Sequence, residues 1–194
     1  ADIEISVLPD KRFVSRGGEK LARAFDVFDV QASGLTCLDV GASTGGFTDC
    51  LLQFGATKVY AVDTGRGQLH QKLLNDERVV SMERTNLVDC NGLPEQVDLV
   101  VADVSFTSLE SVLPTAFDQL KAGGQAVGLL KPQFEAKKIE VPRGGVIIDP
   151  FIHAAVIGRF VKWAGDSRIR VRNLANSGIL GDKGNREFLL HLEP

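Results

Sequence analysis

A short apolar segment that runs directly into a glycine-rich loop constrains the fold more than any other feature of this sequence. Residues 35–40 read Leu-Thr-Cys-Leu-Asp-Val and are a candidate buried strand, and residues 41–46 read Gly-Ala-Ser-Thr-Gly-Gly. From Phe47 to Phe54, apolar side chains recur at positions i, i+3, i+4 and i+7, which predicts a helix. A strand, a glycine loop and a helix in this order are typical of α/β folds in which the backbone closely approaches a ligand.

The same alternation of strands and helices continues along the chain. Strands are expected over 35–40, 58–63, 78–82, 97–103, 125–130, 169–175 and 187–192. Helices are expected over 17–28, 47–54, 109–120 and 150–163, and Pro114 is expected in the first turn of its helix. Residues 132–149 are expected to form a loop. With 194 residues, 44% of them hydrophobic, the chain can bury one core of ordinary size. We therefore expect a Rossmann-like, doubly wound, mostly parallel seven-stranded sheet with helices on both faces.

The glycine loop is the expected cofactor site, because ligands of doubly wound folds bind at the carboxyl ends of the strands. Its spacing is GxxxGG, whereas dinucleotide-binding folds show GxGxxG. Asp63 follows about 20 residues later, where an acid can accept hydrogen bonds from ribose hydroxyls. This arrangement suits S-adenosylmethionine better than NAD, with Asp39 orienting the loop and Asn86 near the adenine. The expected cofactor-binding residues are Asp39, Gly41, Ala42, Ser43, Thr44, Gly45, Gly46, Phe47, Asp63, Asn86 and Asp103.

The group that receives a methyl is indicated by the residues after the fourth strand. Residues 103–106 read Asp-Val-Ser-Phe, not the Asn/Asp-Pro-Pro-aromatic motif of amino-directed methyltransferases. Base-carbon methylation through a thiolate requires a reactive cysteine, and Cys90 has no evident activating group. Asp103 and Lys131 remain at the strand ends, and a carboxylate with an amine suits proton removal from a hydroxyl.

Five blocks together resemble the TlyA (hemolysin A-like) family of FtsJ-type RNA methyltransferases. They are Val14-Ser-Arg-Gly-Gly-Glu-Lys20, Leu38-Asp-Val-Gly-Ala-Ser-Thr-Gly-Gly-Phe47, Ala102-Asp-Val-Ser-Phe106, Leu130-Lys-Pro-Gln-Phe-Glu135 and Gly184-Asn-Arg-Glu187. The resemblance implies 2′-O-methylation of ribose in ribosomal RNA, with ribosomal RNA or a ribosomal subunit as partner. It also implies that Lys20, Asp103, Lys131 and Glu187 form a catalytic tetrad. Free lysine is protonated at neutral pH, so proton acceptance and hydroxyl orientation both stay open for Lys131.

Members of this family usually carry a small RNA-binding domain before the methyltransferase domain. We expect residues 1–16 to be a linker or arm, residues 17–194 to be the methyltransferase domain, and the upstream domain to be absent from this chain. The chain would then be a fragment of a longer protein.

The net charge of −3 hides an uneven distribution along the chain. Residues 1–130 hold 11 Lys+Arg and 18 Asp+Glu, whereas residues 131–172 hold 9 and 4. Cations give RNA affinity without sequence information, so the expected RNA-binding residues are Arg16, Lys137, Lys138 and Arg143. Arg168, Arg170 and Arg172 alternate along a strand, and RNA contact and sheet packing explain them equally well.

Two other features point to a cytoplasmic protein without stable membrane association. No apolar run reaches the roughly 18–20 residues of a membrane-spanning helix. The cysteines Cys37, Cys50 and Cys90 have no metal-ligand spacing, so no metal site is expected, and Cys37 and Cys50 are expected in the core. Three alternatives remain open: an NAD(P)-dependent oxidoreductase, a hemolysin-type membrane-lytic protein, and a catalytically inactive RNA-binding domain.

Overall fold

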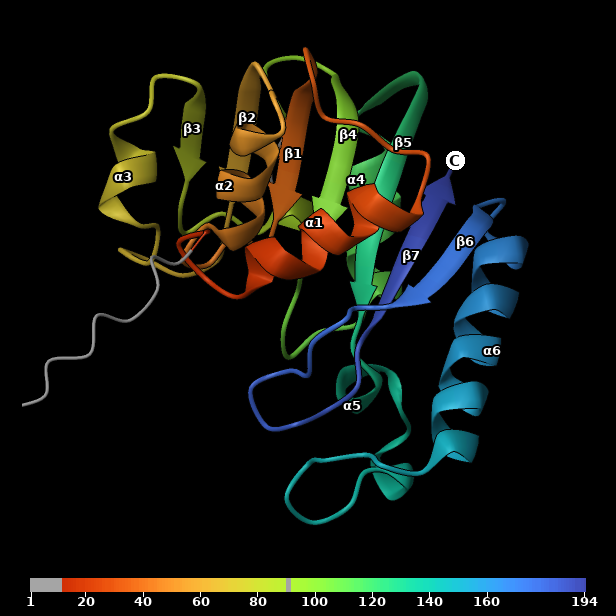
Figure 1. Ribbon diagram of the computed structural model, residues 1–194. Coiled ribbons are helices and arrows are strands. Elements are labelled where there is room, and N and C mark those ends of the chain that lie inside the picture. The colour runs from red at the N-terminus through yellow and green to blue at the C-terminus, as the bar shows by residue number, and fades with distance from the viewer. Residues whose placement is uncertain (1–11, 90–91) are drawn as a thin grey trace, which may run out of the picture.

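A seven-stranded sheet lies at the centre of the molecule, with the strand order β3-β2-β1-β4-β5-β7-β6 (Figure 1). The structure is a computed structural model that describes residues 12–89 and 92–194. The strands are β1 (Thr36–Val40), β2 (Lys58–Val62), β3 (Val79–Met82), β4 (Val97–Ala102), β5 (Leu120–Leu130), β6 (Arg170–Asn176) and β7 (Phe188–Glu193). Strands β1 to β5 pair in parallel, and β7 is antiparallel to both β5 and β6. The predicted seven-stranded, mostly parallel sheet is therefore confirmed.

Helices cover both faces of the sheet. They are α1 (Gly17–Val27), α2 (Gly46–Gln53), α3 (Gln71–Leu74), α4 (Leu109–Phe117), α5 (Pro132–Glu135) and α6 (Pro150–Asp166), with two 3-10 turns, η1 (Leu87–Asp89) and η2 (Lys138–Glu140). In Figure 1, α1 and α2 lie in front of the sheet and α4 lies behind it. Because strand side chains alternate between faces, each face of the sheet has its own hydrophobic core. One core contains Leu21, Cys37, Cys50 and Leu51. The core on the other face contains Leu38 together with residues of α4 and α6. The predicted core positions of Cys37 and Cys50 are confirmed.

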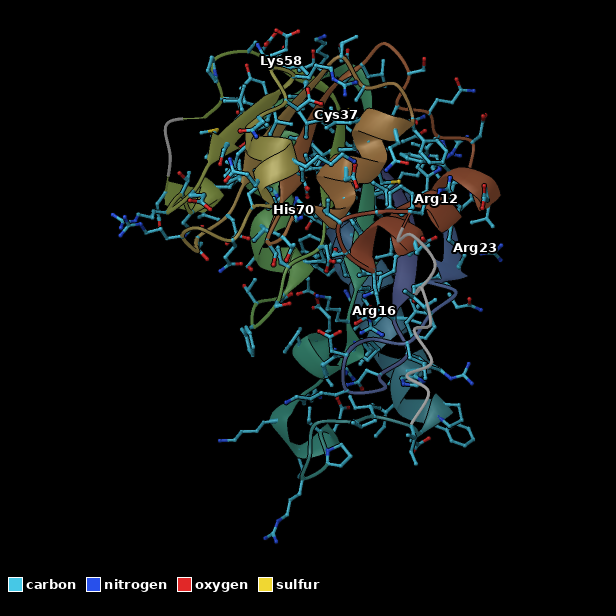
Figure 2. The ribbon with its side chains drawn as sticks, turned by 60° about the vertical axis from the view of Figure 1, so that its left-hand side comes forward. Arg12, Arg16, Arg23, Cys37, Lys58 and His70 are labelled. Carbon is cyan, nitrogen blue, oxygen red and sulfur yellow. The ribbon has the colours of Figure 1, made fainter. Side chains whose placement is uncertain are left out.

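The direction of winding reverses at β1. This strand pairs with β2 on one side and with β4 on the other, so the chain winds outward in both directions from the β1–β4 pair. In doubly wound folds this reversal opens a crevice at the carboxyl ends of the two strands. Figure 2 shows Cys37 and Lys58, at the starts of β1 and β2, at the opposite end of the sheet from Arg16. The crevice is thus at the Arg16 end.

The boundaries of several elements differ from those predicted. Helix α4 ends at Phe117 and β5 already begins at Leu120, so the expected helix over 109–120 is too long. The expectation that Pro114 lies in the first helical turn is wrong: α4 begins at Leu109, which puts Pro114 in the second turn, where it has no N–H to donate to the Glu110 carbonyl. The segment 132–149 contains α5 and η2 and is not wholly irregular. Residues 1–11 of the predicted arm and Cys90 lie outside the described residues.

Glycines let the amino ends of α1 and α2 approach each other closely. A Cβ atom on Gly46 would lie 2.9 Å from the backbone nitrogen of Gly18 and 3.2 Å from the Cα of Gly17. It would also lie 2.2 Å from the side-chain oxygen of Ser15, which is the nearest atom. The distance to the Gly18 nitrogen is shorter than real Cβ contacts, and that neighbour is backbone, so it cannot rotate away. This contact places α1, which carries Lys20, against the glycine loop.

We expect Gly46→Ala to destabilise the protein by about 1–3 kcal/mol, because the added methyl group forces two backbones apart. The control is Gly158→Ala in the middle of α6, where a Cβ would meet nothing within 4 Å. That change should stabilise the helix by about 0.5–1 kcal/mol. Urea unfolding of both variants measures the difference, and equal effects at the two positions would contradict the proposed contact.

Candidate functional site

Two adjoining cavities open at the carboxyl ends of β1 and β4. The first has a volume of about 750 Å³ and is lined by residues after β1, β2, β3 and β4, among them Gly41, Asp63 and Asn86. The second has a volume of about 490 Å³ and is lined by the glycine loop, the start of α1, Lys131 and Glu187. Gly41, Ser43, Asp103 and Ser105 line both cavities, so a ligand in one borders on the other.

The glycine loop closely approaches the end of β4. Gly41 has a φ of +83°, and a Cβ at this position would lie only 2.6 Å from the carbonyl oxygen of Asp103. Only glycine satisfies both the conformation and the contact. The next loop residue with a positive φ is Ser43, at +48°. Its amide donates a 2.8 Å hydrogen bond to Asp63 Oδ2, which ties the loop to the end of β2.

The predicted cofactor residues divide into three groups. Gly41, Ser43, Asp63, Asn86 and Asp103 line the first cavity, and Gly41, Ala42, Ser43, Thr44, Gly46, Phe47 and Asp103 line the second. Asp39 and Gly45 line neither of these two cavities. Gly45 instead begins α2 with a φ of +96°, and a Cβ there would collide with Leu73.

Asp39 is fully buried between β1 and α2. Its Oδ2 accepts a 2.6 Å hydrogen bond from the Thr48 hydroxyl, and its Oδ1 has no hydrogen-bond partner among the described residues. Burial raises the pKa of Asp39 to about 7, and the carboxylates of Asp103 and Asp63 also raise it, while the Thr48 hydrogen bond lowers it. A role for Asp39 in orienting the loop stays a prediction, and its hydrogen bond with Thr48 connects it to α2.

The four tetrad residues come from distant parts of the chain and line the second cavity together. Lys131, directly after β5, places Nζ 2.7 Å from Asp103 Oδ1 and donates a 2.9 Å hydrogen bond to Ser105 Oγ. The contact with Asp103 is a charge pair without the alignment of a directed hydrogen bond. The Lys131 side chain is only 11% exposed, so its charge is held in one place beside the carboxylate.

A second ion pair lines the same cavity. Lys20 Nζ, from α1, lies 2.5 Å from Glu187 Oε2, just before β7, and both side chains are at most 10% exposed. Each buried lysine thus has its own buried or half-buried carboxylate. Removing one partner would leave an unpaired charge in the cavity wall, which is more costly than never having had the pair.

Four residues near Lys131 have contacts that the sequence alone did not indicate. Ser105 contacts Nζ directly. Phe106 is 92% exposed with a φ of +62°, and its ring lies 5.2 Å from that of Phe134. Glu135 accepts hydrogen bonds from the Ser108 hydroxyl (2.7 Å) and the Leu109 amide (2.8 Å), so it caps α4. All lie in blocks quoted for the family resemblance, but only the fold shows that they meet.

The predicted RNA-binding residues lie at the edge of the site. Arg16, which is labelled in Figure 2, lines the second cavity. It pairs with Asp182, which belongs to the loop between β6 and β7. Lys137, Lys138 and Arg143 are exposed and line neither of the two cavities. They belong to the segment beside α5 that projects below the sheet in Figure 1.

Comparison with known proteins identifies the family of this fold. The model of the family described as FtsJ-like methyltransferase matches residues 13–193. The chain belongs to the FtsJ-like methyltransferase family. It is 44% identical over 188 residues to a Mycobacterium tuberculosis relative named 16S/23S rRNA (cytidine-2′-O)-methyltransferase TlyA. The aligned region covers 94% of this chain and 69% of the relative.

Solved structures agree with this assignment. A Lactococcus lactis protein that carries the hemolysin name is 44% identical, with a TM-score of 0.90 over 94% of this chain and 89% of the other. Fibrillarin from Aeropyrum pernix, solved with bound S-adenosyl-L-methionine, has a TM-score of 0.68 over 91% of this chain and 76% of the other. At 15% identity, the likeness to fibrillarin shows the shared fold alone. Membership of the FtsJ-like family decides against the NAD(P)-dependent oxidoreductase.

As a member of the FtsJ-like family, the chain uses S-adenosylmethionine as its cofactor. The residues present fit this cofactor. The first cavity offers the Asp63 carboxylate to ribose hydroxyls, Gly41 has no side chain to block the approach, and Asp103 places a negative charge at the junction of the cavities, where a cationic sulfonium is favoured. Within residues 12–89 and 92–194, no helix has the length and hydropathy needed to cross a membrane.

We expect the buried Asp39 to make stability depend on pH in the protein without cofactor. Its folded pKa of about 7 lies above the value near 3.9 of an unfolded aspartate, so the folded state keeps the proton over a range in which the unfolded state loses it. The free energy of unfolding of the wild type should therefore fall relative to that of Asp39→Asn as pH rises from about 4 to about 7, and then level off. Urea unfolding at a series of pH values measures this, and parallel curves for the two proteins would contradict it.

Proposed function

We propose that this chain transfers a methyl group from S-adenosylmethionine to a ribose 2′-hydroxyl of ribosomal RNA. The observation that carries the proposal is the convergence of Lys20, Asp103, Lys131 and Glu187 on one cavity that adjoins the predicted cofactor cavity. The name of the Mycobacterium tuberculosis relative describes the same type of reaction. The division into an arm over residues 1–16 and a methyltransferase domain over residues 17–194 belongs to this proposal.

The bound cofactor supplies a methyl group on a positively charged sulfur. The protein contributes mainly position, because holding the reacting groups in line can account for much of the acceleration of such a displacement. A lysine ammonium has three N–H groups, and Asp103 and Ser105 take up two directions around Lys131 Nζ. The remaining direction is available to the 2′-hydroxyl. A protonated Lys131 donates its third N–H there and orients the hydroxyl, whereas a neutral Lys131 directs its lone pair there and accepts the hydroxyl proton. Lys20 and Glu187 balance each other's charge in the lining of the same cavity.

RNA reaches this cavity from the edge that carries the exposed cations. In the proposal, Arg16, Lys137, Lys138 and Arg143 contact phosphates and so hold the strand without reading its sequence. The exposed ring of Phe106 offers a flat face on which an unpaired base can stack next to Lys131. Single-stranded or flipped-out nucleotides suit this arrangement better than a duplex does.

Substitution of Lys131 tests the catalytic role. Lys131→Ala should lower the rate of methylation by about 10²–10⁴-fold, because it removes the group that orients or deprotonates the hydroxyl. The affinity for S-adenosylmethionine, measured by calorimetric titration, should stay within about twofold, since Lys131 lines only the second of the two cavities. Methyl transfer is measured with labelled cofactor and ribosomal RNA or ribosomal subunits.

The matched control is Lys121→Ala. Lys121 pairs with Asp98 at the opposite end of β5 and should leave both rate and affinity unchanged. An equal loss of cofactor affinity in Lys131→Ala would contradict its catalytic role. Mapping of ribose methylation in ribosomal RNA from cells with and without the protein tests the proposal as a whole, and no change at any 2′-hydroxyl would overturn it.

Membrane lysis is a second candidate because a solved relative carries the hemolysin name. It is tested by leakage of dye from lipid vesicles. Leakage by Lys131→Ala and wild type alike, at concentrations where the wild type does not methylate RNA, would support lysis over methylation.

A further inference from the structure

Two loops, one of which ends on the tetrad residue Glu187, are joined by a buried side chain. The first, which we name the basic loop, is residues 137–147 and carries Lys137, Lys138 and Arg143. The second is the β6–β7 loop, residues 177–187, which ends on Glu187. Figure 1 shows both loops projecting below the sheet beside α5. They lie about 40 residues apart in the sequence, so their relative position is a product of the tertiary fold.

Asn185 makes the connection. It is only 2% exposed, although it belongs to a loop. Its Nδ2 donates a 2.8 Å hydrogen bond to the Gly145 carbonyl, and its Oδ1 accepts a 2.9 Å hydrogen bond from the Ile147 amide. Its own carbonyl accepts a 2.9 Å hydrogen bond from the Gly181 amide. One side-chain amide thus satisfies two backbone groups of the basic loop while its backbone closes its own loop.

Apart from Asn185, the segment is held at its two ends and by one turn, in which the Gly145 amide donates a 2.9 Å hydrogen bond to the Pro142 carbonyl. Gly144 and Gly145 have φ values of +103° and +75°, and a Cβ on either would meet nothing within 4 Å. Ile147 anchors the end of the segment: its side chain is 1% exposed, and its carbonyl lies 3.0 Å from Nε2 of His153 on α6. At the other end, Glu140 pairs with Arg159, also on α6. Arg143 lies between these two attachments.

On the tetrad side, the β6–β7 loop is folded closely around Glu187. A Cβ on Gly181 would lie 2.3 Å from Glu187 Oε1, so the loop passes directly over the carboxylate. The Glu187 carbonyl accepts a 3.0 Å hydrogen bond from the Ser177 amide. Asn185 therefore links the loop that encloses Glu187 to the loop that carries Arg143.

We propose that Asn185 is a positioning residue that holds the basic loop in register with the Lys20–Glu187 pair, so that Arg143 binds an RNA phosphate while the ribose lies at Lys131. This inference rests on the proposed function and adds how phosphate binding is aligned with the tetrad. The side chain must donate and accept at once, because it faces a carbonyl and an amide. Aspartate can only accept when ionised, and alanine can do neither.

Trypsin measures the attachment without RNA. A protease needs a mobile substrate segment, so the rate of cleavage after Arg143 reports how readily the loop leaves its position. Asn185→Ala should speed this cleavage by about tenfold or more, since opening loses two buried hydrogen bonds of about 1 kcal/mol each. Asn173→Ala, at an exposed position on β6, is the matched control and should not change the rate. An unchanged rate in Asn185→Ala would overturn the attachment.

Kinetics with RNA measure the alignment. We expect Asn185→Ala and Arg143→Ala each to raise the KM for RNA and each to reduce the slope of log KM against log salt by about one phosphate contact. The double variant should be no worse than the single ones, because both changes remove the same contact. The affinity for S-adenosylmethionine should be unchanged in all three variants. Effects that multiply in the double variant, or a fall in kcat with KM unchanged, would overturn the inference.

A conservative variant and the wild-type activity distinguish misfolding, failure of the proposed function and failure of this inference. Asn185→Asp retains the size and the acceptor for Ile147 and loses only the donor to Gly145, so it provides a folded variant if alanine unfolds the chain. It should show the same trypsin and KM effects in the same direction. Failure of the proposed function would show in the wild type, as no methyl label on RNA. Failure of this inference would show as an active wild type in which the Asn185 and Arg143 effects are independent.

Discussion

The close contact between Gly41 and Asp103 is the constraint on which the site depends. It joins the end of β1 to the end of β4, where the winding of the sheet reverses, and it leaves no room for a Cβ. Because the contact is backbone to backbone, the loop and the Asp103 carboxylate are placed by the sheet itself. The two cavities meet at these residues, so this one contact determines where a bound cofactor borders on the tetrad.

The charges of the site are arranged around that junction as pairs. Lys131 is held by Asp103 and Ser105, and Lys20 is held by Glu187, so the second cavity contains two lysines without a large unpaired charge. Side chains held in this way lose little entropy when a substrate binds, which is the physical basis of preorganised sites. The exposed cations lie outside this core, where salt and solvent weaken them and where contacts to phosphates form and break easily.

Much of the fold and of the site could be predicted from the sequence, and the failures have physical causes. The glycine loop and the acids after β1, β2 and β4 follow from strand periodicity, because the carboxyl ends of parallel strands meet at one edge. Pro114 was misplaced although the start of the helix at Leu109 was predicted correctly: the first turn spans only about four residues, and Pro114 is the sixth. Asp39 matches the pattern of a ligand-binding acid, yet it faces Thr48 within the core.

The sequence by itself determined the fold class, the positions of the strands and the residue types available at their ends, because these depend on periodicity and on local backbone preferences. Only the tertiary structure decided which side chains meet. Lys20 and Glu187 form a pair although nearly the whole chain separates them, and Asn185 reaches Gly145 and Ile147 across two loops. Such contacts depend on the packing of helices and loops around the completed sheet, and no short stretch of sequence contains that information.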